Sequence, residues 1–285
     1  MRAKPLLAVA VGLFCAGSAG ATPFTFDTGP ATNQMAMASR PDSPGKIEIE
    51  AADDFILADH TQINSATFTG LIPAGATISD VRVEIYRVFP LDSANPPSGN
   101  VPTRANSPSD VAFADRDAGA AELTFSTLVL DPNFAALNSV LNGINKKPGQ
   151  TTGGEGAVRG QEVQFNVNFT TPFDLPADHY FFIPQVQLAG ANDNFYWLSG
   201  QRPTVPPFAP DLQAWIRNAN LDPDWLRVGT DIVGGTTPPT FNGAFSLAGA
   251  TVPPGGGNQV PLPPAVWAGL MTAAGLGVIR SRRRA

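Results

Sequence analysis

The sequence predicts an all-β protein: an antiparallel β-sandwich of jelly-roll type, with an N-terminal signal peptide and one C-terminal transmembrane helix. Residues 81–88 and 163–170 alternate apolar and polar side chains without error, as strands with one buried and one solvated face do. Shorter strand patterns recur without interleaved helices, which argues against a parallel sheet. The 28 glycines and 28 prolines supply the many turns that such a sandwich requires.

Weaker strand patterns continue along the chain, with turn-forming residues between them. They cover residues 46–50, 55–57, 63–69, 123–130, 180–188, 195–198, 212–217, 225–233 and 241–247. Pro73-Ala74-Gly75, Asp131-Pro132-Asn133 and Gly234-Gly235 are typical of turns. Residues 134–144 compete as a short helix, because their apolar side chains recur at helical spacing. Residues 92–120 and 146–160 are expected to be long loops, where binding sites usually lie.

The chain is acidic, with 24 acidic and 18 basic residues and a net charge of −6. Six of the 18 basic residues lie in the two terminal segments described below, which leaves 12 against 24 acidic residues, a net charge of about −12, for the part between them. Nucleic-acid binding depends on Lys and Arg neutralising phosphates, so that class of function is set aside. An acidic surface suits an extracellular protein that must stay soluble.

The C-terminal segment has three parts in order. A proline motif, Val260-Pro261-Leu262-Pro263-Pro264, opens it, and residues 262–279 carry no ionisable side chain. A helix of that length rises roughly 27 Å, close to the thickness of a bilayer's hydrocarbon core. Arg280, Arg282, Arg283 and Arg284 follow, and such a cation-rich flank stays cytoplasmic, which places the rest of the chain outside. A Pro- and Gly-rich linker, residues 251–259, precedes this segment.

This arrangement resembles the PEP-CTERM sorting signal of Gram-negative bacteria, in its VPLPA-type variant. Residues 260–263 and 265–267 match the motif, whereas Pro264 stands where alanine is usual. The resemblance implies a substrate of exosortase, a membrane enzyme that cuts near the proline motif. It also implies a link to exopolysaccharide and biofilm matrix.

The N-terminal segment reads as a signal peptide, residues 1–21. Arg2 and Lys4 precede an apolar stretch, and Ala19-Gly20-Ala21 offers the small residues that signal peptidase needs, so Thr22 is the expected mature start. The single cysteine, Cys15, lies within this segment. The exported domain, residues 22–250, therefore has no thiol for a disulfide or a metal.

A possible metal site is the acidic pair Asp53 and Asp54. The run Ala52-Asp53-Asp54-Phe55 looks like the opening strand of jelly-roll modules in exported bacterial proteins, where it precedes a buried aromatic side chain. Both carboxylates are oxygen ligands of the kind that Ca²⁺ takes. The alternative is that both are solvated turn residues and that the protein has no cofactor.

No catalytic constellation can be assembled. His60 and His179 lack the spaced third ligand of a metal motif and are expected to be turn or rim histidines. No nucleophile elbow occurs, and the mature chain has no cysteine nucleophile. Glycoside hydrolysis needs only two facing carboxylates, and Glu84 and Glu162 lie on or beside the clearest strands, but strand carboxylates are usually just solvated.

Carbohydrate binding is the leading alternative function. Trp197, Trp215 or Trp225 could stack on a sugar ring if exposed, although tryptophan in a sandwich more often fills the core. The polar residues Asn192 and Asp193 precede Trp197 and could place it at a loop rim.

Together these observations predict a non-enzymatic protein of the cell surface or extracellular matrix. We expect it to leave the cytoplasm through the Sec translocon and signal peptidase, to be held transiently in the inner membrane by its C-terminal helix, and then to be processed by exosortase. A lectin-like module that binds extracellular polysaccharide is the alternative, and a glycoside hydrolase is less favoured.

Overall fold

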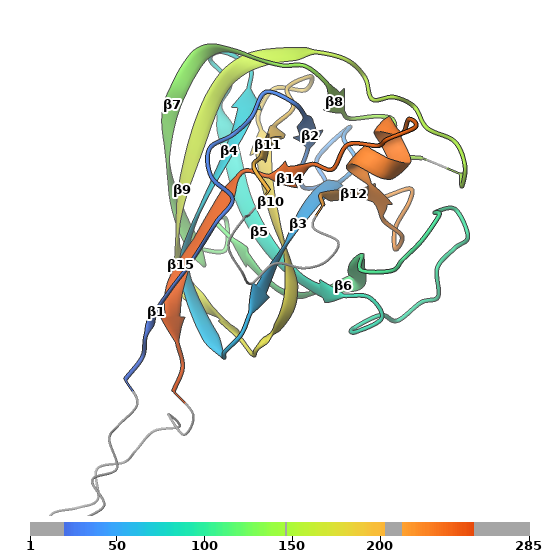
Figure 1. Ribbon diagram of the computed structural model, residues 1–285. Coiled ribbons are helices and arrows are strands. Elements are labelled where there is room, and N and C mark those ends of the chain that lie inside the picture. The colour runs from blue at the N-terminus through green and yellow to red at the C-terminus, as the bar shows by residue number, and fades with distance from the viewer. Residues whose placement is uncertain (1–19, 146, 203–212, 254–285) are drawn as a thin grey trace, which may run out of the picture. The chain divides into compact units, whose positions relative to one another are not determined.

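Two β-sheets make up most of the computed structural model of this chain, which describes residues 20–145, 147–202 and 213–253 (Figure 1). All strand pairs are antiparallel except that of β2 with β8. The expected all-β class is confirmed. Residues Ala21–Val252 form one unit, close to the expected domain of residues 22–250. Within the described residues no helix is long and apolar enough to cross a bilayer. The expected transmembrane helix at 262–279 lies outside them.

The first sheet has nine strands. They are β1 (Pro23–Asp27), β2 (Ala36–Ala38), β4 (Thr61–Ile72), β7 (Leu123–Ala136), β8 (Ser139–Val140), β9 (Val158–Leu175), β11 (Tyr196–Gly200), β14 (Asn242–Gly243) and β15 (Phe245–Thr251). One edge of β4 pairs with β15 and, further along, with β11, and its other edge pairs with β9. Because β9 also pairs with β7, the long strands β15, β4, β9 and β7 form one continuous surface.

The second sheet has six strands in the order β13-β12-β3-β10-β5-β6. They are β3 (Ile49–Leu57), β5 (Ile78–Val88), β6 (Pro108–Asp117), β10 (Asp178–Leu188), β12 (Trp215–Asn218) and β13 (Leu226–Arg227). A short π-helix, η1 (Val228–Val233), follows β13. The chain moves repeatedly from one sheet to the other, so each sheet combines segments far apart in the sequence.

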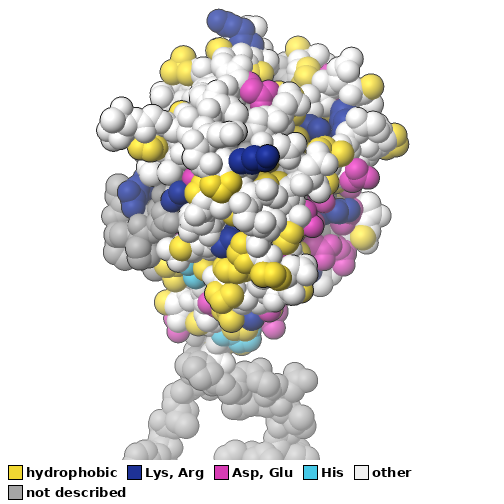
Figure 2. Space-filling model, turned by 90° about the vertical axis from the view of Figure 1, so that its right-hand side faces the viewer, with side chains coloured by type: hydrophobic (Ala, Val, Ile, Leu, Met, Phe, Trp, Pro, Cys, Tyr) yellow, Lys and Arg dark blue, Asp and Glu magenta, His cyan; other side chains and the backbone are white. Residues whose placement is uncertain are grey.

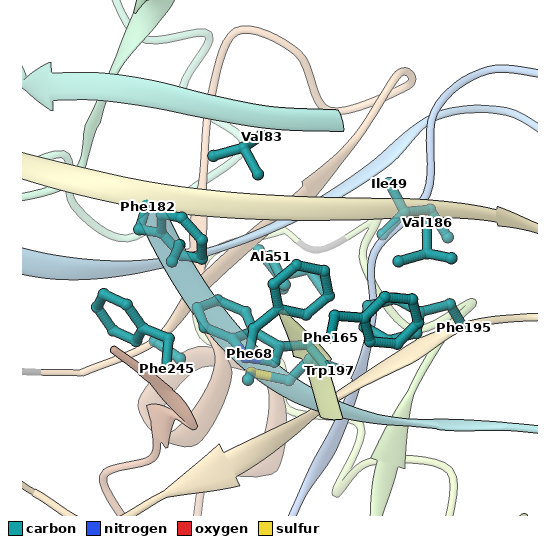
Figure 3. Close-up of a cluster of buried hydrophobic side chains, with 14 of the residues drawn as sticks. Ile49, Ala51, Phe68, Val83, Phe165, Phe182, Val186, Phe195, Trp197 and Phe245 are labelled. Atoms are coloured by element: carbon teal, nitrogen blue, oxygen red, sulfur yellow. The ribbon is translucent and has the colours of Figure 1, made fainter. Parts of the chain in front are cut away.

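Aromatic side chains fill the space between the sheets (Figure 3). Phe182 of β10 stacks on Phe245 of β15 with ring centroids 4.9 Å apart, which joins the second sheet to the first. Phe68 of β4 stacks on Phe165 of β9 at 4.7 Å, and Phe195 meets the edges of both rings. Such ring pairs add to the apolar area that the two sheets bury against each other. The two sheets therefore pack face to face as a sandwich.

The outer face of the second sheet is covered as well. Residues 89–107, which we name the covering loop, connect β5 to β6 and are closed by a hydrogen bond from the Phe89 N–H to the Ser107 carbonyl. On this face Trp225, at the end of the turn at 219–225, packs against the Tyr86 ring at 5.6 Å between centroids. Both belong to a second apolar cluster, whose other members are Ala52, Phe181, Ile183 and Trp215. Figure 2 looks on this side of the molecule and shows acidic side chains gathered at one edge, beside basic ones.

The prediction of a short helix over residues 134–144 is wrong. Strand β7 continues to Ala136, which pairs with Val158 of β9, and β8 follows directly. Pro132 does not end β7, because β7 pairs only with β9 and an edge strand tolerates a missing N–H. Val140 and Ile144 are fully buried, so the apolar spacing reflects contacts of an extended chain with the core.

Three further expectations need correction. Strand β3 runs from Ile49 to Leu57 and joins the end of the strand expected at 46–50 to the one expected at 55–57, so Asp53 and Asp54 lie inside a strand and not in a turn. The long loop expected at 92–120 contains β6, whose backbone pairs with β5. The strand expected at 225–233 shrinks to β13, after which the chain turns into η1.

Candidate functional site

Uncharged polar side chains gather on the outer face of the first sheet. Ser65, Thr67 and Thr69 alternate along β4 with the buried Ala66 and Phe68. Strand β9 repeats the pattern. Alternate side chains of a strand point to opposite faces, so the apolar set that binds the sheet to the core leaves the polar set in solvent. We name this surface the hydroxyl–amide face; its members are Ser65, Thr67, Thr69, Thr124, Ser126, Gln164, Asn166, Asn168 and Ser246.

The register of the strands arranges these side chains in rows. Thr67 of β4 lies opposite Asn166 of β9, which lies opposite Ser126 of β7. On the other side of Thr67, β15 places Ser246 in the same row. A second row runs from Ser65 through Asn168 to Thr124. The first row crosses four strands and the second three, and together they form an extended surface of uncharged polar side chains, with Asp27 of β1 opposite Ser246 at its edge.

Hydrogen bonds hold part of this face in place. The hydroxyls of Thr67 and Ser246 lie 2.7 Å apart, and the Gln164 amide donates to Asn166 Oδ1 at 2.7 Å. Hydroxyl and amide groups both donate and accept hydrogen bonds, so each keeps further capacity for a ligand. The pre-ordered side chains lose less entropy when they bind.

A hollow of about 270 Å³ lies on this face. Thr67, Thr69 and Gln164 line it, together with Asp27 and Glu162. Burial, followed by the nearby charge of Asp131, raises the pKa of Glu162. The hollow offers hydrogen-bond donors and acceptors but no cation, which suits a neutral ligand rich in hydroxyl groups.

Asp53 and Asp54 have separate protein partners. Asp53 is fully buried and accepts hydrogen bonds from the Gly243 N–H at 2.9 Å and from the Asn242 amide at 3.3 Å, so it joins β3 to β14. Burial, followed by the charge of Asp54, raises its pKa well above the usual value. The Asp54 side chain points to the opposite face of β3, where its Oδ2 lies 2.8 Å from Nε2 of His179. The expected buried aromatic after this pair, Phe55, is 1% exposed.

No metal centre forms around that pair in the described part of the chain. Among residues 20–145, 147–202 and 213–253, no three His, Cys, Asp or Glu side chains lie together as a metal site would require. His60 lies 2.8 Å from Asp174 at the surface, where both side chains are exposed. Each of the two histidines thus has one carboxylate neighbour.

The tryptophans cannot act as exposed platforms. Trp197, Trp215 and Trp225 are 0% exposed, and the Trp197 indole N–H donates to the Ala244 carbonyl inside the core. The expected ligand-binding role of Trp197 is therefore wrong, because a sugar ring has no access to its face. Asn192 is exposed and Asp193 half-buried on the loop before β11, so these two do lie at a rim.

The carboxylates considered for glycoside hydrolysis do not face each other. Glu84 lies on the outer face of the second sheet and Glu162 on the outer face of the first. Glu84 is instead hydrogen-bonded to Glu50, closer than the spacing of 5 Å or more that glycosidases of known types use. This geometry does not support the two-carboxylate mechanism at Glu84 and Glu162.

The sorting residues lie outside the described part of the chain. These are Val260, Pro261, Leu262, Pro263, Pro264 and the terminal arginines, together with Ala19 of the expected signal-peptide cleavage site. Ala21, the last residue of that site, is described and exposed, two residues before β1.

Comparisons with protein-family models, with curated proteins and with solved structures found no match. Sequence reasoning recognised the alternation over residues 163–170 but did not interpret Gln164, Asn166 and Asn168 as a site. The available signal was that their polar positions carry amides and no charge, although 15% of the chain is charged. Which strands lie beside them depends on contacts distant in sequence.

Proposed function

We propose that this chain is an exported, non-enzymatic protein of the cell surface or extracellular matrix, whose sandwich binds neutral polysaccharide through the hydroxyl–amide face. The observation that supports the binding role is the register of uncharged polar side chains across β15, β4, β9 and β7. Neutral sugars present many hydroxyl groups that need donors and acceptors, and no charge that needs a counter-ion.

The edge of this face favours the same ligand. Leu128 and Leu130 of β7 are 55% and 47% exposed, and Leu130 also lines the hollow. Sugar rings carry C–H groups as well as hydroxyls, so apolar side chains beside amides match them in both respects. The two antiparallel sheets, which exchange the chain repeatedly, also support the jelly-roll type of sandwich for this protein.

Binding is tested with neutral polysaccharides such as dextran and cellulose oligomers, by affinity electrophoresis of the full-length chain in mild detergent. Ser126→Arg places a long charged side chain in the row of Thr67 and Asn166, and Ser126 forms no side-chain hydrogen bond among the described residues that would be lost. We expect affinity to fall by about tenfold or more. Thr237→Arg, at an exposed position outside the face, is the matched control. Equal binding by both variants would show that the hydroxyl–amide face is not the binding site.

Export and sorting rest on the terminal sequences. An immunoblot of tagged protein in cells with and without exosortase tests this part. Processing near Pro261 by exosortase predicts a smaller product only in cells that contain the enzyme. The same mature size in both strains would contradict it.

The proposal assigns no cofactor, and a structural Ca²⁺ at Asp53 and Asp54 is the alternative. Thermal unfolding in EDTA and in millimolar Ca²⁺ distinguishes them. A calcium-dependent rise in Tm that Asp54→Asn abolishes would support the alternative, because ligand binding to the folded state stabilises it.

A further inference from the structure

Two neighbouring hollows lie at one end of the first sheet, outside the hydroxyl–amide face. The smaller, of about 130 Å³, is lined by Arg159, Asn192 and Tyr196 among others. The larger, of about 350 Å³, is lined by Asn133 and by Pro73 and Arg159, which both hollows share. We name the pair the end groove. Arg159 lies where its two halves meet.

Arg159 is an available cation. It is exposed on β9, opposite Ala135 of β7. In the part of the chain that the structure describes, no carboxylate forms an ion pair with Arg159, whereas Arg82 and Arg217 each pair with acidic partners. A guanidinium group offers several donors in a planar fork that matches a carboxylate.

Neutral polar groups surround this cation. The Tyr196 hydroxyl, whose pKa burial and then the charge of Glu155 raise further above neutral, can donate a hydrogen bond. Asn194 accepts a hydrogen bond from Arg40 at 2.6 Å and donates to the Asn192 carbonyl at 3.2 Å, which orders the loop around Asn192. The Asn192 side chain itself is exposed. One exposed cation with amides and a hydroxyl beside it suits a ligand that combines one negative charge with several hydroxyl groups.

We propose that the end groove binds a carboxylate-bearing saccharide, a uronate unit of an acidic polysaccharide, with Arg159 paired with its carboxylate. This inference rests on the proposed polysaccharide binding and extends it to a charged sugar. The two sites are neighbours in the first sheet: Leu71 of β4, which lines the smaller hollow, lies opposite Glu162 of β9, which lines the hollow of the hydroxyl–amide face. A single polymer chain can therefore contact both.

An acidic peptide fits the groove less well. It has no hydroxyl groups between its carboxylates for the amides and the Tyr196 hydroxyl to hydrogen-bond, and beside Tyr196 those carboxylates would meet the negative charge of Glu155. A uronate carries one charge per ring, and its remaining groups are hydroxyls that the groove can hydrogen-bond. Poly-glutamate is therefore a competing probe in the test.

The test measures binding of the full-length chain in mild detergent to polygalacturonate, to its fully methyl-esterified form and to dextran, by biolayer interferometry. Methyl esterification removes the charge and keeps the sugar backbone. We expect the wild-type chain to bind polygalacturonate at least about tenfold more tightly than the ester, and Arg159→Gln to abolish that preference, since a hydrogen-bonded charge pair is worth about one to two orders of magnitude in affinity. Arg202→Gln, at an exposed arginine that lines neither hollow, makes the same charge change and is expected to bind as the wild type does.

The outcomes separate this inference from the proposed function. Three results would each overturn the proposal that the end groove binds a uronate. They are equal binding of the acid and the ester, equal behaviour of the Arg159→Gln and Arg202→Gln variants, and tighter binding of poly-glutamate than of polygalacturonate. Dextran binding that Ser126→Arg weakens would leave the proposed function standing in those cases. Conversely, the chain could bind polygalacturonate in a way that requires Arg159 and yet not bind dextran. That result would support uronate binding in the end groove and contradict neutral-polysaccharide binding by the hydroxyl–amide face.

Discussion

Glu84 carries a carboxyl group that its surroundings keep protonated. It is 8% exposed on the outer face of the second sheet and is hydrogen-bonded to Glu50. Burial first, and then the charges of Glu50 and Glu48, raise the pKa of Glu84 to about 8. Glu50 itself pairs with Arg217 and accepts a hydrogen bond from the Tyr86 hydroxyl at 2.8 Å. The Glu84 carboxyl is therefore protonated at neutral pH and donates the hydrogen bond to Glu50.

Replacing Glu84 by glutamine should stabilise the protein at alkaline pH. Between about pH 4.5 and 8 the Glu84 carboxyl is ionised in the unfolded chain and protonated in the folded one, so the wild type loses stability as the pH rises through this window. Glu84→Gln removes that loss, because its amide is neutral at every pH and can still donate to Glu50. We expect the difference in unfolding free energy to grow from pH 4.5 to 8 and to reach a few kcal/mol. Urea denaturation across this range measures it, and a difference that does not depend on pH would contradict the assignment.

Glu155 should show the opposite pH dependence. Burial alone would raise its pKa, but the backbone N–H groups of Leu141, Gly143 and Asn142 donate to its carboxylate, outweigh burial and lower the pKa. The Glu155 carboxylate therefore stabilises the fold at pH values above its pKa in the unfolded chain, and this stabilisation is lost as the pH falls through its lower pKa in the folded chain. Glu155→Gln should cost about 1 kcal/mol near pH 7 and progressively less toward pH 3. Thermal melts at both pH values test this, and an equal cost at both would rule it out.

At the scale of elements, the covering loop depends on one buried arginine. Arg104 is 5% exposed and pairs with Asp224 at 2.8 Å and with Asp110 at 2.9 Å. Its guanidinium also lies over the Phe89 ring, 4.2 Å from the centroid. A single cation therefore compensates two buried carboxylates and joins the loop to β6 and to the turn before β13.

Removing this cation should be strongly destabilising. Arg104→Met leaves two carboxylates without their partner in a buried site, which typically costs about 3–5 kcal/mol. Adding Asp224→Asn to that variant should recover part of the loss, because the substitution removes one uncompensated charge. Urea denaturation of the single and double variants measures both effects. A double variant that is no more stable than the single one would contradict the role of Arg104 in compensating the Asp224 charge.

Strands in which apolar and polar side chains alternate strictly could be predicted from the sequence. Strand segments that exist because they pair with a distant strand could not. Residues 81–88 and 163–170 lie within β5 and β9, because one face of each strand packs into the core. The extension of β7 to Ala136 was missed, since Pro132 and apolar residues at helical spacing indicated a helix locally. Pairing with β9 overrides that local preference, and nothing near residue 134 reveals it.

At the scale of the whole molecule, the candidate surfaces are products of the sandwich. Strands β7, β9, β4 and β15 are distant in sequence, and only their lateral pairing brings Ser126, Asn166, Thr67 and Ser246 into one row. The three tryptophans considered as ligand platforms lie in the core, which is the more common place for tryptophan in a sandwich, because large apolar rings fill the space under and between sheets. The rim position of Asn192 was predictable, since its polar neighbourhood precedes a strand.

The first and last strands of the sandwich, β1 and β15, pair with each other, so β1 is an integral part of the fold. β1 pairs with β15 along its whole length, and the Thr251 N–H donates to the Thr22 carbonyl at 2.9 Å. Phe26 of β1 lies 5.1 Å from the Phe245 ring. The expected mature start at Thr22 leaves β1 intact, because β1 begins at Pro23.

Removing β1 should therefore weaken the whole sandwich. A chain that starts at Thr28 loses the backbone pairs of β1 with β15 and the burial of Phe24 and Phe26, which should lower the unfolding free energy by roughly 3 kcal/mol or more relative to a chain that starts at Thr22. Phe26→Ala in the longer chain should reproduce part of that loss. Urea denaturation of the three proteins measures the order. Equal midpoints for the chains starting at Thr22 and Thr28 would show that β1 is an accessory strand and would contradict this prediction.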